Sequence, residues 1–208
     1  MSAGNPAGKR ALLLACCCLL LVFCTACRKT QAPAMFIEPA QLTDKEKDIA
    51  DLLGLGKASI LYDFTLDDTV RSMQINVYEL IGGEWSLMAG GGGQAFTDTQ
   101  GRIALGFESL AQGMRIAVQS EHSGGSTTNE REDDSGAAPM GMATATLAEK
   151  KEITYAQEIP LAVQIHTAQN EVHSYTPDSF FTPEEYEKHG YEHVYALTIS
   201  FSQAARGA

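Results

Sequence analysis

All five cysteines of this chain lie within its first 27 residues, and the remaining 181 residues contain none. No disulfide can therefore form within the long remainder of the chain. Any fold built from those 181 residues must be held together by the burial of apolar side chains. A chain of this length suits one hydrophobic core and hardly two.

The N-terminal segment has the order of parts that is typical of a secretory signal. Lys9 and Arg10 precede an uninterrupted apolar run over residues 11–23, and small residues follow it. The uncharged stretch of 16 residues from Ala11 to Ala26 makes a helix of roughly 24 Å. This is shorter than the hydrocarbon core of a bilayer, about 30 Å, so a retained transmembrane anchor is the weaker interpretation.

The end of this segment, Phe23-Cys24-Thr25-Ala26-Cys27, resembles the lipobox of bacterial lipoproteins. In that family the position three before the modified cysteine is usually Leu, and here it is Cys24. The resemblance implies a diacylglyceryl group on Cys27 and attachment to the extracytoplasmic face of the cell membrane. Ordinary signal-peptidase cleavage at the same bond would instead release a secreted protein with Cys27 as its N-terminus. Beyond residue 27 the chain resembles no named family.

The expected organisation is a signal peptide over residues 1–26, a tether over residues 27–41 and a single β-rich domain over residues 42–208. The chain without its signal peptide has 13 basic and 26 acidic residues, a net charge of −13. Nucleic acid is therefore excluded as a partner, because phosphate binding needs a basic face. A mobile loop is expected at about residues 121–142, where Gly, Ser, Thr, Asn, Glu and Asp dominate.

Apolar periodicity predicts one helix and then mostly strands. Thr43 to Glu46 has the form of a capping box, and Ile49, Leu52 and Leu53 follow on one face of a helix over about residues 43–53. Period-two alternation then predicts strands at residues 59–66, 70–81, 84–89, 102–107, 114–120, 143–147, 159–167 and 194–201.

Turn signals every 8 to 12 residues favour an antiparallel arrangement over βαβ units. A short C-terminal helix is expected from Thr182 to Gly190, with Pro183 at its first position. The predicted fold class is mainly β: an antiparallel β-sandwich, or a barrel-like variant, with one N-terminal amphipathic helix and this short C-terminal helix.

Histidines offer the only pattern that suggests a metal. His166 and His173 are the candidates, but a zinc site needs three or four converging ligands, and no H-E-x-x-H motif is present. No Gly-x-Ser-x-Gly motif is present either. We therefore expect no cofactor and no enzymatic activity. A surface hydrolase or a metal-dependent enzyme is the alternative.

Aromatic residues give the one positive indication of binding. Between residues 175 and 195 the chain is rich in aromatic side chains that a loop and a short helix could present to a protein, peptide or glycan ligand: Tyr175, Phe180, Phe181, Tyr186 and Tyr191. The alternative is that these side chains pack the short helix onto the sheet. The predicted function is a lipid-anchored extracytoplasmic binding or interaction module.

Overall fold

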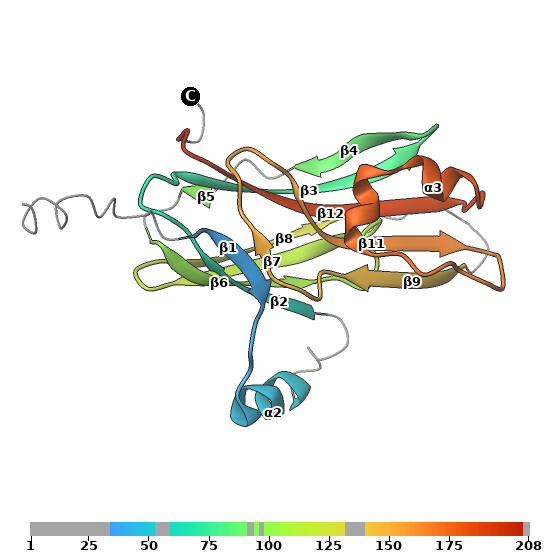
Figure 1. Ribbon diagram of the computed structural model, residues 1–208. Helices are drawn as coiled ribbons and strands as arrows, with labels where there is room; N and C mark the ends of the chain where they lie inside the picture. The colour runs from blue at the N-terminus through green and yellow to red at the C-terminus, as the bar shows by residue number, and fades with distance from the viewer. Residues whose placement is uncertain (1–33, 53–58, 91–93, 96–97, 132–139, 206–208) are drawn as a thin grey trace, which may run out of the picture. The chain divides into compact units, whose positions relative to one another are not determined.

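Two antiparallel sheets stacked face to face make up the fold (Figure 1). The computed structural model describes residues 34–52, 59–90, 94–95, 98–131 and 140–205. Sheet 1 has the order β10 (Lys151–Glu152), β1 (Phe36–Pro39), β2 (Ser59–Thr65), β6 (Gln100–Gly106), β7 (Gly113–Ser120), β8 (Gly124–Glu130). Sheet 2 has the order β4 (Glu84–Gly90), β3 (Ser72–Ile81), β12 (His193–Ser202), β11 (Ile159–Thr167), β9 (Gly141–Thr146), and β5 (Gln94–Ala95) also pairs with β3. The predicted antiparallel sandwich is confirmed.

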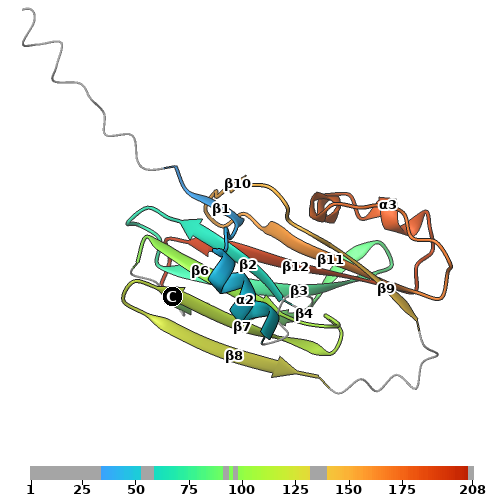
Figure 2. The same cartoon turned by 90° about the horizontal axis from the view of Figure 1, so that it is seen from below.

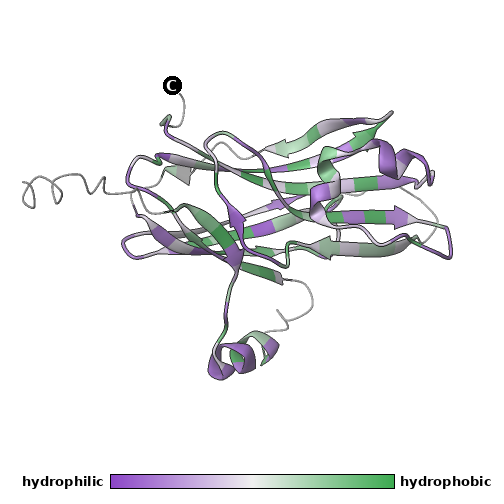
Figure 3. Cartoon of the chain, viewed as in Figure 1, coloured by the Kyte–Doolittle hydropathy of each residue, from purple (hydrophilic) through white to green (hydrophobic). Residues whose placement is uncertain are grey.

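The main core lies between the sheets and is made by alternate residues of the strands. Figure 3 shows hydrophobic and hydrophilic residues interleaved along them. Along β2, β3, β7 and β12, the apolar residues that alternate in the sequence pack in this core. Its members include Tyr62, Phe64, Met73, Ile75, Val77, Met114, Val118, Leu197, Ile199 and Phe201.

Strand β11 differs from its prediction. The alternation places Leu161, Val163 and Ile165 on one face, whereas Leu161 packs in the main core and the other two pack in a second cluster. The cause is an irregularity between Pro160 and Ala162 in the pairing with β12, which shifts the register. All nine residues of β11 are buried, because the strand is covered on both faces.

A segment that precedes β12 provides this second cover, on the outer face of sheet 2. It contains the 3₁₀ helix η1 (Pro177–Phe181) and the short helix α3 (Glu184–Glu187), and α3 lies within the predicted range of residues 182–190. Gly190 adopts a positive φ of 62°, which a glycine tolerates without strain as the chain turns back into β12. The segment packs against apolar side chains that point outward from the sheet, Val163, Ile165, Val194 and Ala196.

Helix α2 (Asp44–Leu52) lies on the outer side of sheet 1 (Figures 1 and 2). Its predicted capping box is present: Thr43 N donates to Glu46 Oε2 at 2.7 Å, and Glu46 N donates to Thr43 Oγ1 at 3.3 Å. The apolar face is not buried, since Ile49 is 58 % and Leu52 is 87 % exposed. Leu53, the third residue of that predicted face, lies outside the described residues.

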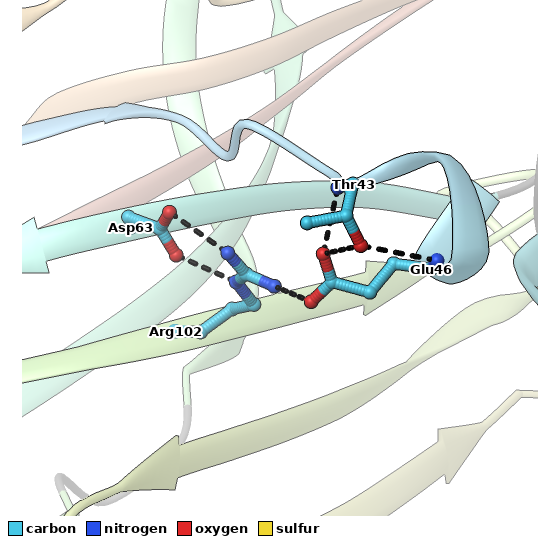
Figure 4. Close-up of polar contacts among 4 residues, drawn as sticks. All are labelled: Thr43, Glu46, Asp63 and Arg102. Carbon is cyan, nitrogen blue, oxygen red and sulfur yellow. Dashed lines mark hydrogen bonds and ion pairs between the residues drawn. The ribbon is translucent and has the colours of Figure 1, made fainter.

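An ion-pair network connects α2 to sheet 1 (Figure 4). Arg102 on β6 donates to both carboxylate oxygens of Asp63 on β2, at 2.6 and 3.0 Å, and to Glu46 Oε1 at 3.1 Å. Hydrogen bonds from the backbone and hydroxyl of Thr43, and then the contact with Arg102, lower the pKa of Glu46. The position of the helix therefore depends on polar contacts and not on its apolar residues.

Two predicted boundaries are wrong. The range expected as a tether, residues 27–41, includes β1, because Ile37 is fully buried in the core and β1 pairs with both β2 and β10. The range expected as a mobile loop, residues 121–142, includes β8 and the first residues of β9. Strand β8 lacks apolar side chains but is held at the sheet edge by its hydrogen-bonded pairing with β7.

Candidate functional site

The histidines proposed as metal ligands contact different side chains. His166 is 8 % exposed, and its Nε2 lies 3.0 Å from Gln164 Oε1. His173 is exposed, and its ring is tilted against that of His189, with ring centroids 3.7 Å apart. Among the residues that the structure describes, no group of three or more His, Cys, Asp or Glu side chains has an arrangement that could hold a metal ion.

All of the aromatic candidates except Phe181 pack in the cluster that covers sheet 2. Tyr186 is 1 % exposed and burial raises its pKa to about 12, while Phe181 is 54 % exposed. Tyr175 packs on Tyr186 in a tilted arrangement with centroids 4.5 Å apart, and Phe180 stacks on Trp85 of β4 at 5.1 Å. The remaining aromatic candidate, Tyr191, is half-buried beside them. This geometry is that of a packed layer and not of an open aromatic surface.

One Asp–His contact lies at the end of sheet 1. Asp98 accepts hydrogen bonds from Ser120 Oγ at 2.6 Å and from His122 N at 2.9 Å, and His122 Nδ1 lies 2.7 Å from its other oxygen. Nucleophilic catalysis needs the serine to contact the histidine, which takes its proton. Here Ser120 contacts the carboxylate instead, so these three residues stabilise the β7–β8 turn.

A small apolar hollow lies between the sheets, where β3 and β4 face β7 and the end of β8. We call it the inter-sheet pocket; its volume is about 100 Å³. Apolar side chains line its interior: Ile75, Val77, Met88, Leu110, Met114 and Ile116. Its polar lining comes from Asn129, Glu130 and Arg131. An apolar hollow with a few polar groups is the usual form of a small-molecule site.

A β-bulge in β4 shapes one wall of the inter-sheet pocket. Val77 pairs with Ala89 and Tyr78 pairs with Leu87, which leaves Met88 as the extra residue. Both Met88 and Ala89 consequently pack toward the main core, whereas Leu87 is exposed. Bulges of this kind redirect a side chain and are frequent beside binding sites.

The wall of the inter-sheet pocket opposite β4 requires a glycine at the start of β7. Gly113 begins β7 with φ of +113°, and a Cβ at this position would collide with the backbone oxygen of Asn129. An L side chain is therefore excluded both by the conformation and by the close approach of β8. Only glycine lets the two strands meet at this end of the pocket.

The buried amide of Gln164 holds the loop between β6 and β7, which forms the floor of the inter-sheet pocket. Its Oε1 accepts a hydrogen bond from Leu110 N at 2.8 Å, and its Nε2 donates to Glu108 O at 3.0 Å. Gln164 also contacts Thr144 Oγ1 and His166 Nε2, each at 3.0 Å. With both ends of this amide hydrogen-bonded, the loop is fixed and the pocket is preformed.

Arg131 joins the two edge strands beside the pocket. Its Nη2 donates to the backbone oxygen of Met88 at 2.8 Å, and its backbone N donates to Gln112 O at 2.8 Å. The guanidinium of Arg131 has no carboxylate within 4.0 Å among the residues that the structure describes. It is therefore a positive group at the edge of an apolar hollow.

The sequence pattern does not reveal the inter-sheet pocket. Interior residues such as Ile75 and Val77 alternate as core residues do, and Arg131 lies in the range expected as a mobile loop. The polar residue that holds its floor, Gln164, was visible as an uncharged polar residue inside an apolar run. Cys27, the predicted lipidation site, lies outside the described residues.

The chain was compared with protein-family models, with curated proteins and with solved structures, and none of them matched. Within the described part of the chain, no helix combines the length and the apolar character needed to cross a bilayer.

Proposed function

We propose that this chain is a binding module held at the extracytoplasmic face of the cell membrane by a diacylglyceryl group on Cys27. The observation that carries the proposal is the small-residue segment ending in Cys27, directly after a basic pair and an apolar run. Eight residues separate this cysteine from Phe36, where β1 begins. Fully extended, they span about 27 Å, so the domain would stay close to the lipid surface.

Lipid, and not the protein surface, would supply the attachment. A net charge of −13 after removal of residues 1–26 repels anionic headgroups. Each buried methylene contributes about 0.8 kcal/mol, so two acyl chains hold a protein stably where one chain is marginal.

The inter-sheet pocket supports the binding part of the proposal. It is preformed by the bulge in β4, by Gly113 and by the hydrogen bonds of Gln164. A preformed site avoids the entropy cost of ordering its walls when a ligand enters. Ser120 and His122 each contact Asp98. This arrangement is not that of a serine hydroxyl activated by a histidine, so no specific observation favours the hydrolase.

The test of the anchor is metabolic labelling of the full-length chain in a bacterium with an alkyne-bearing fatty acid. We expect the wild-type protein to be labelled, shortened by residues 1–26 and recovered with membranes. Cys27→Ala should lose the label and either remain as the uncleaved precursor or appear in the medium.

Cys24→Ala is the matched control, because it removes a neighbouring thiol and keeps a small residue. It should be labelled and processed like the wild type. A Cys27→Ala variant that is still cleaved and retained in the membrane would defeat the proposal. A wild-type protein that is cleaved, unlabelled and secreted would defeat it as well.

A further inference from the structure

We propose that the inter-sheet pocket binds a short aliphatic carboxylate, whose hydrocarbon chain enters the apolar interior and whose carboxylate pairs with Arg131. This inference rests on the proposed function, since it names the ligand class of the binding module.

The interior of the pocket selects for hydrocarbon. Ile75, Val77 and Leu110 contribute branched aliphatic side chains, and Met88 and Met114 contribute flexible thioethers that adapt to the shape of a ligand. Apolar cavities stay dry and take up apolar molecules, and a cavity of about 150 Å³ holds the six carbons of benzene. A pocket of about 100 Å³ therefore accepts roughly four carbons.

Arg131 selects for a carboxylate at the polar end. A guanidinium has five N–H donors in a planar fork. Among the residues that the structure describes, this one donates from Nη2 to Met88 O. That bond positions the side chain against β4 and leaves other donors for a ligand. Arginine pairs with carboxylates through two parallel hydrogen bonds, which gives geometric selection as well as attraction.

Glu130 is the residue that opposes this assignment, because it also lines the pocket. A carboxylate there would favour an amine. Arg131 is the better candidate because its side chain crosses from the end of β8 to the backbone of β4, whereas no hydrogen bond or ion pair ties the Glu130 side chain to a described residue. The acidic net charge weakens anion binding, so we expect a dissociation constant on the order of 1 mM.

The test uses the protein as it is isolated from cells, in phospholipid nanodiscs, with ¹³C-labelled methionine methyl groups. Pentanoate, pentan-1-ol and pentylamine are the probes, because they share a chain length and differ in the head group. Pentanoate should shift the methyl resonances of Met88 and Met114 in the pocket. The methyl of Met142, which is exposed on β9, is the internal control and should not move.

Arg131→Gln should weaken pentanoate binding about tenfold or more and leave pentan-1-ol binding unchanged. Two matched controls accompany it. Glu130→Gln should retain or improve pentanoate binding, and Arg115→Gln, which removes an exposed arginine on β7, should have no effect. Ala89→Phe fills the pocket and should abolish the shifts at both methionines.

Three results would overturn the inference. Pentylamine could bind more tightly than pentanoate and lose its binding in Glu130→Gln, which would make this an amine site. Pentan-1-ol could bind as well as pentanoate, with no effect of Arg131→Gln. Finally, all three probes could leave Met88 and Met114 unshifted. None of these results bears on membrane labelling at Cys27, so failure here is distinguishable from failure of the anchor.

Discussion

The outer faces of the two sheets are covered in different ways. On sheet 2 the outward side chains of β11 and β12 are apolar, and the segment with η1 and α3 buries them together with Tyr186. On sheet 1 the outward side chains include Asp63 and Arg102, and helix α2 meets them through Glu46. The aromatic-rich segment before β12 therefore forms a second core with sheet 2. Helix α2 has an amphipathic sequence but remains exposed.

The difference shows that apolar spacing alone does not determine burial. Ile49 and Leu52 have the helical spacing of a packed face but remain exposed, because the strand faces beneath α2 offer charge. The aromatic cover is buried because the strands beneath it offer Val and Ile on their outer side. Burial requires a complementary surface, which lies elsewhere in the sequence.

Removing the centre of the aromatic cover should have the largest effect. Tyr186→Ala deletes a side chain that is 1 % exposed and should lower the free energy of unfolding by about 3–5 kcal/mol. Urea denaturation measures this change. The control is Phe181→Ala in the neighbouring 3₁₀ helix, which should cost about 1 kcal/mol or less. Equal losses from the two variants would show that the cover is not packed as described.

A smaller effect is expected from removing a hydrogen bond between β4 and the aromatic cover. Trp85 Nε1 donates to Phe180 O at 2.7 Å. Trp85→Phe keeps an aromatic ring but removes this donor, and it should cost about 1 kcal/mol from the lost bond, with some further loss of packing. Hydrogen exchange should become faster at residues 177–187 and stay unchanged in α2. Faster exchange in α2 would contradict the independence of the two covers.

The polar link on sheet 1 should contribute less to global stability. Arg102→Gln removes the ion pairs with Asp63 and Glu46, which are partly exposed, and should cost about 1 kcal/mol or less. Its main effect should be faster hydrogen exchange over residues 44–52. Arg115→Gln, with no such network, is the control. A loss as large as that of Tyr186→Ala would show that α2 is an integral part of the core.

The smallest effect is the pH dependence of the stability that Asp98 and His122 of sheet 1 contribute. Hydrogen bonds from Ser120, and then from His122, lower the pKa of Asp98 to about 2, and Asp98 raises the pKa of His122. The stability from Asp98 is therefore present above about pH 4 and is lost as the pH falls toward 2. The stability from protonated His122 is present below about pH 6.5 and is lost as the pH rises through its raised folded pKa.

Urea midpoints of the wild type and of Asp98→Asn, measured from pH 3 to pH 9, test this dependence. The difference in urea midpoint between the two proteins should be largest between about pH 4 and pH 6.5 and should decrease at lower and at higher pH. In His122→Ala the narrowing on the alkaline side should disappear. A gap that is constant with pH would contradict the described contacts.

Much of the fold was predictable because it is encoded in local alternation. Tyr62 and Phe64 on β2, and Ile75 and Val77 on β3, lie in the main core as their spacing indicates. Each of these strands has one apolar face, so the alternation of apolar and polar residues along the strand indicates which face is buried. The alternation fails for β11, where both faces are buried, and for β8, which has no apolar residue to report a face.

The candidate site was not predictable, because its parts come from separate strands. Met88 reaches the inter-sheet pocket through a bulge, and a bulge depends on the partner strand and not on the sequence of β4 alone. Arg131 lies in a polar run whose sequence resembles a loop. In the structure its backbone N donates a hydrogen bond to Gln112 O. Neither the bulge at Met88 nor the backbone hydrogen bond of Arg131 produces a periodic pattern in the sequence.

The fold class and the strand faces with a single apolar side are predictable from the sequence, because both follow from local patterns. The lack of cysteine after residue 27 likewise shows that burial must stabilise the domain. The proposal that Cys27 is lipidated also comes from the sequence, because a segment of this kind is a linear motif. The three-dimensional structure was needed to show which apolar residues are covered and where the two sheets leave room between them. Those properties depend on contacts between residues far apart in the chain, so no local pattern contains them.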